Sequence, residues 1–191
     1  INNGDKINVV KAMGRLAVLR EKCTDGKCAP GFVGIGHTRW ATHGKPSDVN
    51  SHPHVSENGR IAIVHNGIIE NFAPLKEMLM NRGRVFQSET DTEVAAQLID
   101  FYYKGNILEA VAQAVRELEG SYALGIVCSD DPDTLVAVKS HAPLIVAYGE
   151  GENYFASDVM AVVSHTKTVS YMEDDEIAVV TKENIKFYTP F

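Results

Sequence analysis

The last third of the chain consists of short runs of β-branched and aromatic residues separated by tight turns. Turns such as Asp131-Pro132-Asp133 and Glu150-Gly151-Glu152 are too short for a crossover helix, so the runs that they join pair antiparallel. Strands are predicted at residues 122–129, 134–139, 144–148, 154–156, 168–172, 177–181 and 185–188. A chain that ends in this way folds around antiparallel sheets.

The predicted helices are grouped in the middle of the chain, ahead of these strands. Residues 90–103 give the clearest one, because Thr90 and Glu93 fit a capping box and apolar residues then recur at helical spacing. Further helices are predicted at residues 15–23, 74–81, 107–118 and 159–163, and earlier strands at 7–10, 32–37 and 60–65. Helices that are grouped in this way, with antiparallel strands, indicate an α+β fold.

The composition is that of a single globular domain over residues 1–191. The formal net charge of −7 argues against a nucleic-acid partner, because neutralising phosphates requires clustered Lys and Arg. No apolar run approaches the ~20 residues that a membrane-spanning helix needs, so no membrane association is expected. Three cysteines, an odd number, fit a reducing compartment, and a cytoplasmic location is expected.

Three polar segments carry groups suited to chemistry, and the first is residues 36–44. Arg39, Trp40, Thr42 and His43 follow directly after a predicted strand. The guanidinium of Arg39 can hold a carboxylate through two parallel hydrogen bonds, and Thr42 and His43 can add others. The same residues are also consistent with a surface loop in which Arg39 pairs with a local acid and Trp40 caps the core.

The second segment, residues 65–71, contains Asn66-Gly67 between apolar residues. That dipeptide is first of all a hairpin signal, because both residues tolerate a positive φ. The functional interpretation is that the Asn66 side chain and the Gly67 backbone N–H are two convergent donors. Two such donors are what the oxyanion formed in acyl transfer requires.

The third segment, residues 88–93, places Asp91 in the first turn of the predicted helix. The positive end of the helix dipole favours a carboxylate there, which explains Asp91 without any ligand. Alternatively, Asp91 faces a site and binds an ammonium group of the substrate.

Five of the seven histidines lie between His37 and His65, which suggests a metal site. The region has no cysteine and no His–Glu pair at helical spacing, so we predict no metal. Gly34 and Gly36 lead into no helix, so no nucleotide-binding loop is predicted and no cofactor is expected.

Taken in this order, the segments are much more specific than any one alone. The chain resembles the class II glutamine amidotransferase domain of the glucosamine-6-phosphate synthases (glutamine–fructose-6-phosphate transaminases, isomerising), over about residues 10–191. The motifs that carry the resemblance are GHTRWATHG, SHPH, HNGIIEN, SETDTEV, GEN and ASD.

The resemblance implies an N-terminal-nucleophile hydrolase fold, a four-layer αββα sandwich of two antiparallel sheets, with its first strand and helix missing from this chain. It also implies that glutamine is hydrolysed to glutamate and ammonia. The ammonia passes to a sugar-isomerase domain of the same protein, which converts fructose 6-phosphate to glucosamine 6-phosphate. The implied partners are therefore L-glutamine, that isomerase domain and further copies of the full-length protein in a homo-oligomer.

The family's motifs also imply how the substrate is bound. Arg39 holds the α-carboxylate of glutamine and Asp91 its α-ammonium group. Thr42 and His43 line the pocket, and Trp40 belongs to the loop that closes over it.

The same motifs make Asn66 and Gly67 the oxyanion hole, but the start of the chain departs from the family. The family's nucleophile is an N-terminal cysteine whose own α-amine is the base, which is workable because an α-amine titrates near pKa ~8. Residue 1 here is Ile1, and the three internal cysteines match no nucleophile motif. The chain alone is therefore expected to be inactive, and two alternatives stay open. One is a catalytically silent glutamine-binding or regulatory module, and the other is the glutaminase domain of another class II amidotransferase.

Overall fold

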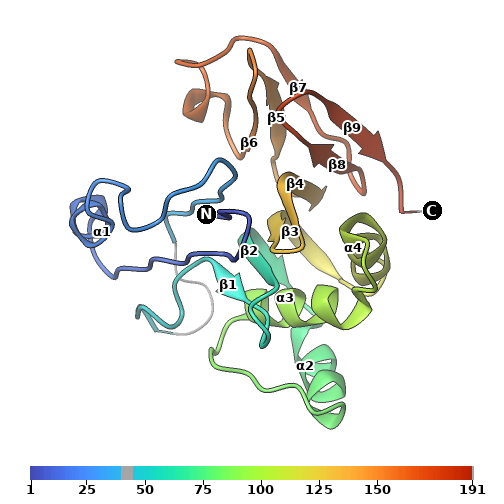
Figure 1. The fold of residues 1–191 in the computed structure, drawn as a ribbon. Helices are drawn as coiled ribbons and strands as arrows, with labels where there is room; N and C mark the ends of the chain where they lie inside the picture. Colours follow the sequence, from blue (N-terminus) through green and yellow to red (C-terminus); the bar gives the residue numbers. More distant parts are fainter. Residues whose placement is uncertain (40–44, 191) are drawn as a thin grey trace.

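Figure 1 shows the computed structural model, which describes residues 1–39 and 45–190. The helices are α1 (Leu16–Lys22), α2 (Phe72–Asn81), α3 (Asp91–Tyr102), α4 (Ile107–Val115) and the 3-10 helix η1 (Val159–Ala161). The strands are β1 (His54–Val55), β2 (Ile61–Ile69), β3 (Gly120–Cys128), β4 (Asp131–Ser140), β5 (Ile145–Tyr148), β6 (Asn153–Ala156), β7 (Val169–Tyr171), β8 (Ile177–Val180) and β9 (Ile185–Tyr188).

The strands form two sheets in which every neighbouring pair is antiparallel. Within the described residues, the large sheet has the order β1-β2-β3-β4-β8-β9 and the small sheet the order β6-β5-β7. Antiparallel sheets combined with separate helices confirm the predicted α+β class. No helix in this part of the chain is long and apolar enough to cross a membrane.

The large sheet has two different faces, because side chains alternate along each strand. Leu124 and Ile126 of β3 point to one face, where they pack against α2, α3 and α4. These strand and helix side chains together form one apolar core. Ala123 and Ala137 point to the other face and pack against Val146 of the small sheet. Small side chains on this second face allow the two sheets to approach closely.

The small sheet is covered on its outer side by a short segment around η1. Val159 and Val162 pack there with Ile145 and Ala147 of β5. The layers are therefore helices, large sheet, small sheet and, in the described part of the chain, a 3-10 turn as the fourth layer (Figure 1).

Two strands predicted near the start of the chain are wrong. Residues 7–10 and 32–37 form only isolated bridges, from Asn2 to Ile7 and from Asn2 to Val33. Gly34 and Gly36 leave the second segment with few side chains that can pack, and Phe32 is fully exposed.

The turn between β3 and β4 also differs from the prediction. It is formed by Ser129 and Asp130, and Pro132 belongs to β4. Proline is tolerated there because it lies near the beginning of the strand, where the β3–β4 register shifts. The two-residue strand β1, within a polar segment, was not predicted at all.

The hairpin interpretation of Asn66-Gly67 is wrong as well, because β2 continues through both residues to Ile69. Gly67 pairs with Tyr122 of β3, and its φ is +110°. A Cβ at Gly67 would lie 2.0 Å from the carbonyl oxygen of Ser121. Glycine is therefore needed here for a close approach of two backbones, and no turn is made.

We predict that Gly125→Ala destabilises the contact between the two sheets. A Cβ at Gly125 would lie 2.2 Å from Cζ of Phe155, so the ring and β6 would have to move. Overpacking of this kind costs about 1–3 kcal/mol, which urea denaturation would measure. Gly36→Ala is the control, because the added Cβ would meet open space; equal losses in the two variants would contradict the prediction.

Candidate active site

A cavity of about 260 Å³ lies between the end of β2 and the start of α3. Arg39, Asn66, Gly67 and Asp91, which come from three separate polar segments, all line it. Its other lining residues are His37, Thr38, His52, His65, Ile68, Thr90 and Thr92. The structure thus brings together four of the residues that the sequence singled out. Trp40, Thr42 and His43 lie outside the described residues, so the expectations for them stay predictions.

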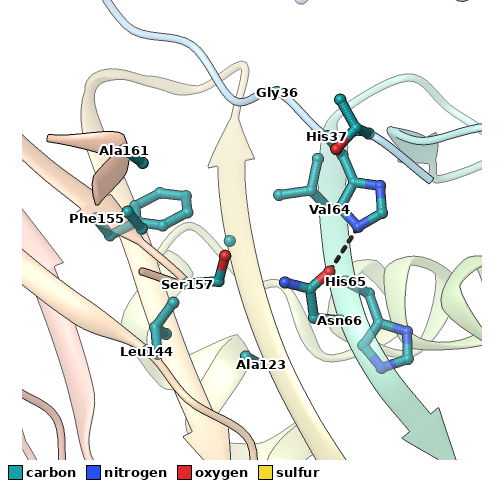
Figure 2. Close-up of a pocket in the computed structure, with 13 residues that line it drawn as sticks. Gly36, His37, Val64, His65, Asn66, Ala123, Leu144, Phe155, Ser157 and Ala161 are labelled. Carbon is teal, nitrogen blue, oxygen red and sulfur yellow. Dashed lines mark hydrogen bonds between the residues drawn. The ribbon is translucent and has the colours of Figure 1, made fainter. Parts of the chain in front are cut away.

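A second cavity of about 260 Å³ lies on the other side of Asn66, between the two sheets. Figure 2 shows it with Asn66 on one wall and Ser157, Phe155 and Leu144 on the opposite wall. His37 and Asn66 line both cavities, so these two side chains stand between them.

The side chain of Asn66 is exposed and held at one end. Its Oδ1 lies 2.7 Å from Nε2 of His37. In Figure 2 the amide nitrogen is turned away from His37, toward the side on which Ser157 lies. This orientation presents two N–H bonds to the second cavity, the one between the sheets. Two such donors suit an electron-rich oxygen.

Asp91 is the first residue of α3 and is only 2% exposed. Its Oδ2 accepts a hydrogen bond from the backbone N–H of Ile69 at 2.8 Å and lies 3.9 Å from Nδ1 of His65. The carboxylate therefore stabilises the end of β2 and also places a buried negative charge at the cavity wall. The helix-dipole interpretation and the ligand interpretation both remain consistent with this position.

The predicted capping box is half present. Thr90 is the N-cap of α3, and its side chain accepts from the backbone N–H of Glu93. The Glu93 carboxylate does not reach back to Thr90; it accepts hydrogen bonds from the backbone N–H groups of Gln87 and Ser88. Glu93 thus fixes the loop that leads into α3.

Arg39 is half-buried and lines the cavity from the end of the segment that follows Gly36. Its Nη1 donates to the backbone carbonyl of Lys45 at 3.4 Å. The guanidinium is the cation of the cavity wall, as Asp91 is its carboxylate.

Several histidines form a connected cluster at the cavity, which the sequence analysis did not predict. The rings of His37 and His52 stack at 4.1 Å, and the backbone N–H of His65 donates to Nδ1 of His52 at 3.1 Å. Nδ1 of His65 lies 2.9 Å from Oγ1 of Thr92. Burial lowers the pKa of His37 and His52, and it lowers that of His54 to about 3.

The crowding of histidines between His37 and His65 is the sequence signal for this cluster, although by itself it suggests a metal site. No group of three or more His, Cys, Asp or Glu in residues 1–39 and 45–190 is arranged to hold a metal ion. His37, His52, His54 and His65 instead contact one another, threonines and an amide.

Comparisons with known proteins agree with this geometry. The glutamine amidotransferase domain family matches residues 2–188. The glutamine–fructose-6-phosphate aminotransferase (isomerizing) of Caldanaerobacter subterraneus subsp. tengcongensis is 53% identical over 191 residues, and that of Clostridium acetobutylicum is 51% identical over 189 residues. These alignments cover 100% and 99% of this chain, but the chain spans only 31% of the length of either relative.

Solved structures show the same fold. The glutamine phosphoribosylpyrophosphate amidotransferase from B. subtilis, in complex with ADP and GMP, is similar with a TM-score of 0.81 and 27% identity, over 100% of this chain and 42% of that one. The stacked antiparallel sheets are those of the N-terminal-nucleophile amidotransferases, which confirms the predicted fold class. With the family match over nearly all its length, the chain belongs to the class II glutamine amidotransferases.

Proposed function

We propose that residues 1–191 form one domain, the glutaminase domain of a glutamine–fructose-6-phosphate aminotransferase. In the full-length protein this domain binds L-glutamine for hydrolysis to glutamate and ammonia, and a sugar-isomerase part of the same protein uses the ammonia to convert fructose 6-phosphate. The observation that carries the proposal is the cavity in which Arg39, Asn66, Gly67 and Asp91 meet. The choice of acceptor is supported by relatives that are about half identical over nearly the whole chain and are glutamine–fructose-6-phosphate aminotransferases.

The two charged groups of the cavity are proposed to bind the amino-acid end of glutamine. Arg39 pairs with the α-carboxylate through its planar fork, and Asp91 pairs with the α-ammonium group. Trp40, Thr42 and His43 complete the pocket in this proposal.

The reacting end of glutamine is proposed to lie at Asn66 and Gly67. Attack on the side-chain amide of glutamine places a negative charge on its oxygen, and the Asn66 amide and the Gly67 N–H donate hydrogen bonds to it. Donors that are fixed before the charge develops stabilise it most, because they need no reorganisation.

We further infer that none of the cysteines in this sequence attacks the substrate. Cys128 is 1% exposed, and its neighbour on β2 is Ile61. Ile61 lies five residues before Asn66, a distance of about 16 Å along the strand. Cys23 and Cys28 lie at the end of α1 and in the turn after it, and neither lines the cavity.

A polypeptide of these 191 residues, verified by intact mass, is therefore expected to release no glutamate from glutamine above background. The physical reason is that it holds the binding groups and the oxyanion donors without an attacking thiolate. Turnover by this polypeptide, lost on replacing one of its cysteines, would show that the inference is wrong.

Asn66→Ala in the full-length enzyme is expected to lower the kcat of glutamine hydrolysis by roughly 10²–10³ and to leave KM nearly unchanged. The oxyanion exists only in the transition state, so its donor contributes there and not to ground-state binding. Asn81→Ala, at the exposed end of α2, is the control and should not change kcat. A similar rate for Asn66→Ala and the control would remove Asn66 from the oxyanion hole.

Asp91→Asn is expected to lower kcat/KM for glutamine by about 10²-fold, because the ammonium group loses its buried counter-charge. Stability should change little, since the amide oxygen of Asn can still accept from the Ile69 N–H. For glutaramic acid, which is glutamine without its α-amine, kcat/KM should fall much less on this mutation. The four measurements form a cycle that isolates the ammonium–carboxylate contact.

Glu93→Gln is the matched control for this cycle. Glu93 is also a buried carboxylate of α3, but its oxygens bind the loop at Ser88 and do not line the cavity. The Glu93→Gln substitution should lower the free energy of unfolding and change kcat/KM by the same factor for both substrates. If Asp91→Asn also affected both equally, Asp91 would act through the helix alone.

A further inference from the structure

The wall between the two cavities contains a contact that the proposed function does not explain. Oδ1 of Asn66 and Nε2 of His37 are 2.7 Å apart, and both side chains line both cavities. An asparagine amide can be rotated by 180°, which exchanges its oxygen and its nitrogen. In one orientation it donates to an oxyanion, and in the other it turns lone pairs toward the negative charge.

We propose that His37 is a positioning residue, which holds the amide of Asn66 with its nitrogen toward the reacting carbonyl. The proposal rests on the proposed function, since it assigns the oxyanion to Asn66. In this arrangement the Nε2–H of His37 donates to Oδ1 of Asn66, and the amide hydrogens stay available for the substrate (Figure 2).

The environment of the His37 ring determines which of its nitrogens carries the proton. Nδ1 is buried, and no hydrogen-bond partner for it lies within residues 1–39 and 45–190. The reversed arrangement, in which Asn66 donates to Nε2, would place the proton on Nδ1 and leave a buried N–H without an acceptor. Buried N–H groups without partners are rarer in proteins than acceptors without partners.

The doubly protonated ring is disfavoured by the same burial. Removal from water lowers the pKa of His37 and outweighs the contacts with Asn66 and the His65 backbone, which raise it; the nearby positive charge of Arg39 lowers it further. A neutral ring has one proton, so a proton on Nε2 excludes one on Nδ1.

The ring of His37 is itself held from β2, the strand that carries Asn66. It stacks on His52 at 4.1 Å with an interplanar angle of 15°, and Nδ1 of His52 accepts from the backbone N–H of His65. His65 precedes Asn66 in the sequence. The His37 ring is therefore held beside Asn66 by contacts that lead back to the same strand, which keeps its Nε2 next to Oδ1 of Asn66.

The test compares two substitutions of His37 in the full-length aminotransferase. His37→Leu removes the donor, and we expect a fall in the glutaminase kcat of roughly 10–100-fold with KM changed less than about twofold, because only part of the oxyanion stabilisation is lost. His37→Gln keeps an N–H near the position of Nε2 and should recover kcat to within a few-fold of the native enzyme. If Gln does no better than Leu, the hydrogen bond to Asn66 is not the cause and the proposal is wrong.

A double substitution separates this proposal from the proposed function. In the Asn66→Ala enzyme, His37→Leu should have no further effect on kcat, because the group that it positions is absent. Additive losses would show that His37 acts on something other than Asn66 and would overturn the proposal. If Asn66→Ala alone leaves kcat unchanged, the oxyanion assignment fails, and the positioning proposal fails with it.

One control variant and one spectroscopic measurement complete the experiment. His165→Leu, an exposed histidine on the side of the small sheet, should leave kcat unchanged. Long-range proton–nitrogen correlation spectra of the enzyme labelled with ¹⁵N-histidine should show His37 protonated at Nε2 and bare at Nδ1. A proton on Nδ1 would reverse the hydrogen bond to Asn66 and contradict the proposal without reference to activity.

Discussion

The pairing of β2 with β3 is the interaction on which both the core and the candidate site depend. Side chains alternate between the two faces along β2, so Ile63 and Ile69 pack against the helices and Asn66 faces the cavity between the sheets. A slip of one residue would exchange these faces, placing Asn66 under α3 and removing the isoleucines from the core. The backbones of Gly67 and Ser121 approach so closely that a side chain at 67 would disrupt the pairing at this point. The same contact that stabilises the sheet therefore positions the Asn66 amide at the cavity.

The second constraint is the burial of carboxylates along α3. Asp91 and Glu93 lie at the N-terminal end, where the helix dipole favours them, and accept backbone N–H groups from β2 and from the preceding loop. Asp100 lies near the C-terminal end, where the dipole is unfavourable, and Arg60 and Arg84 compensate it there. Each buried charge is matched by donors from another segment, so α3 links the cavity to the loops around it.

Much of the fold could be predicted from the sequence because local signals determine it. The cap at Thr90 and the short turns between later strands depend on neighbouring residues and give elements close to the observed ones. The Asn66-Gly67 prediction failed because nine residue pairs between β2 and β3 outweigh a two-residue turn propensity. The contacts of His52 and His65 could not be predicted at all, because they depend on how the loop before β1 packs beside β2. Residue types indicated which groups take part; only the tertiary structure shows how they are joined.

The distribution of charge in the cavity supports the proposal that it binds an amino acid. Among its described lining residues, Arg39 is the permanent cation and Asp91 the carboxylate. Burial lowers the pKa of His37 and His52, so these rings add no charge near neutral pH. The described part of the wall therefore presents one permanent positive and one carboxylate group, which is the complement of an α-carboxylate and an α-ammonium group on one carbon. In the proposed function, the neutral His37 ring adds no charge beside Asn66, so the oriented N–H donors are what stabilises the developing negative charge on the substrate oxygen.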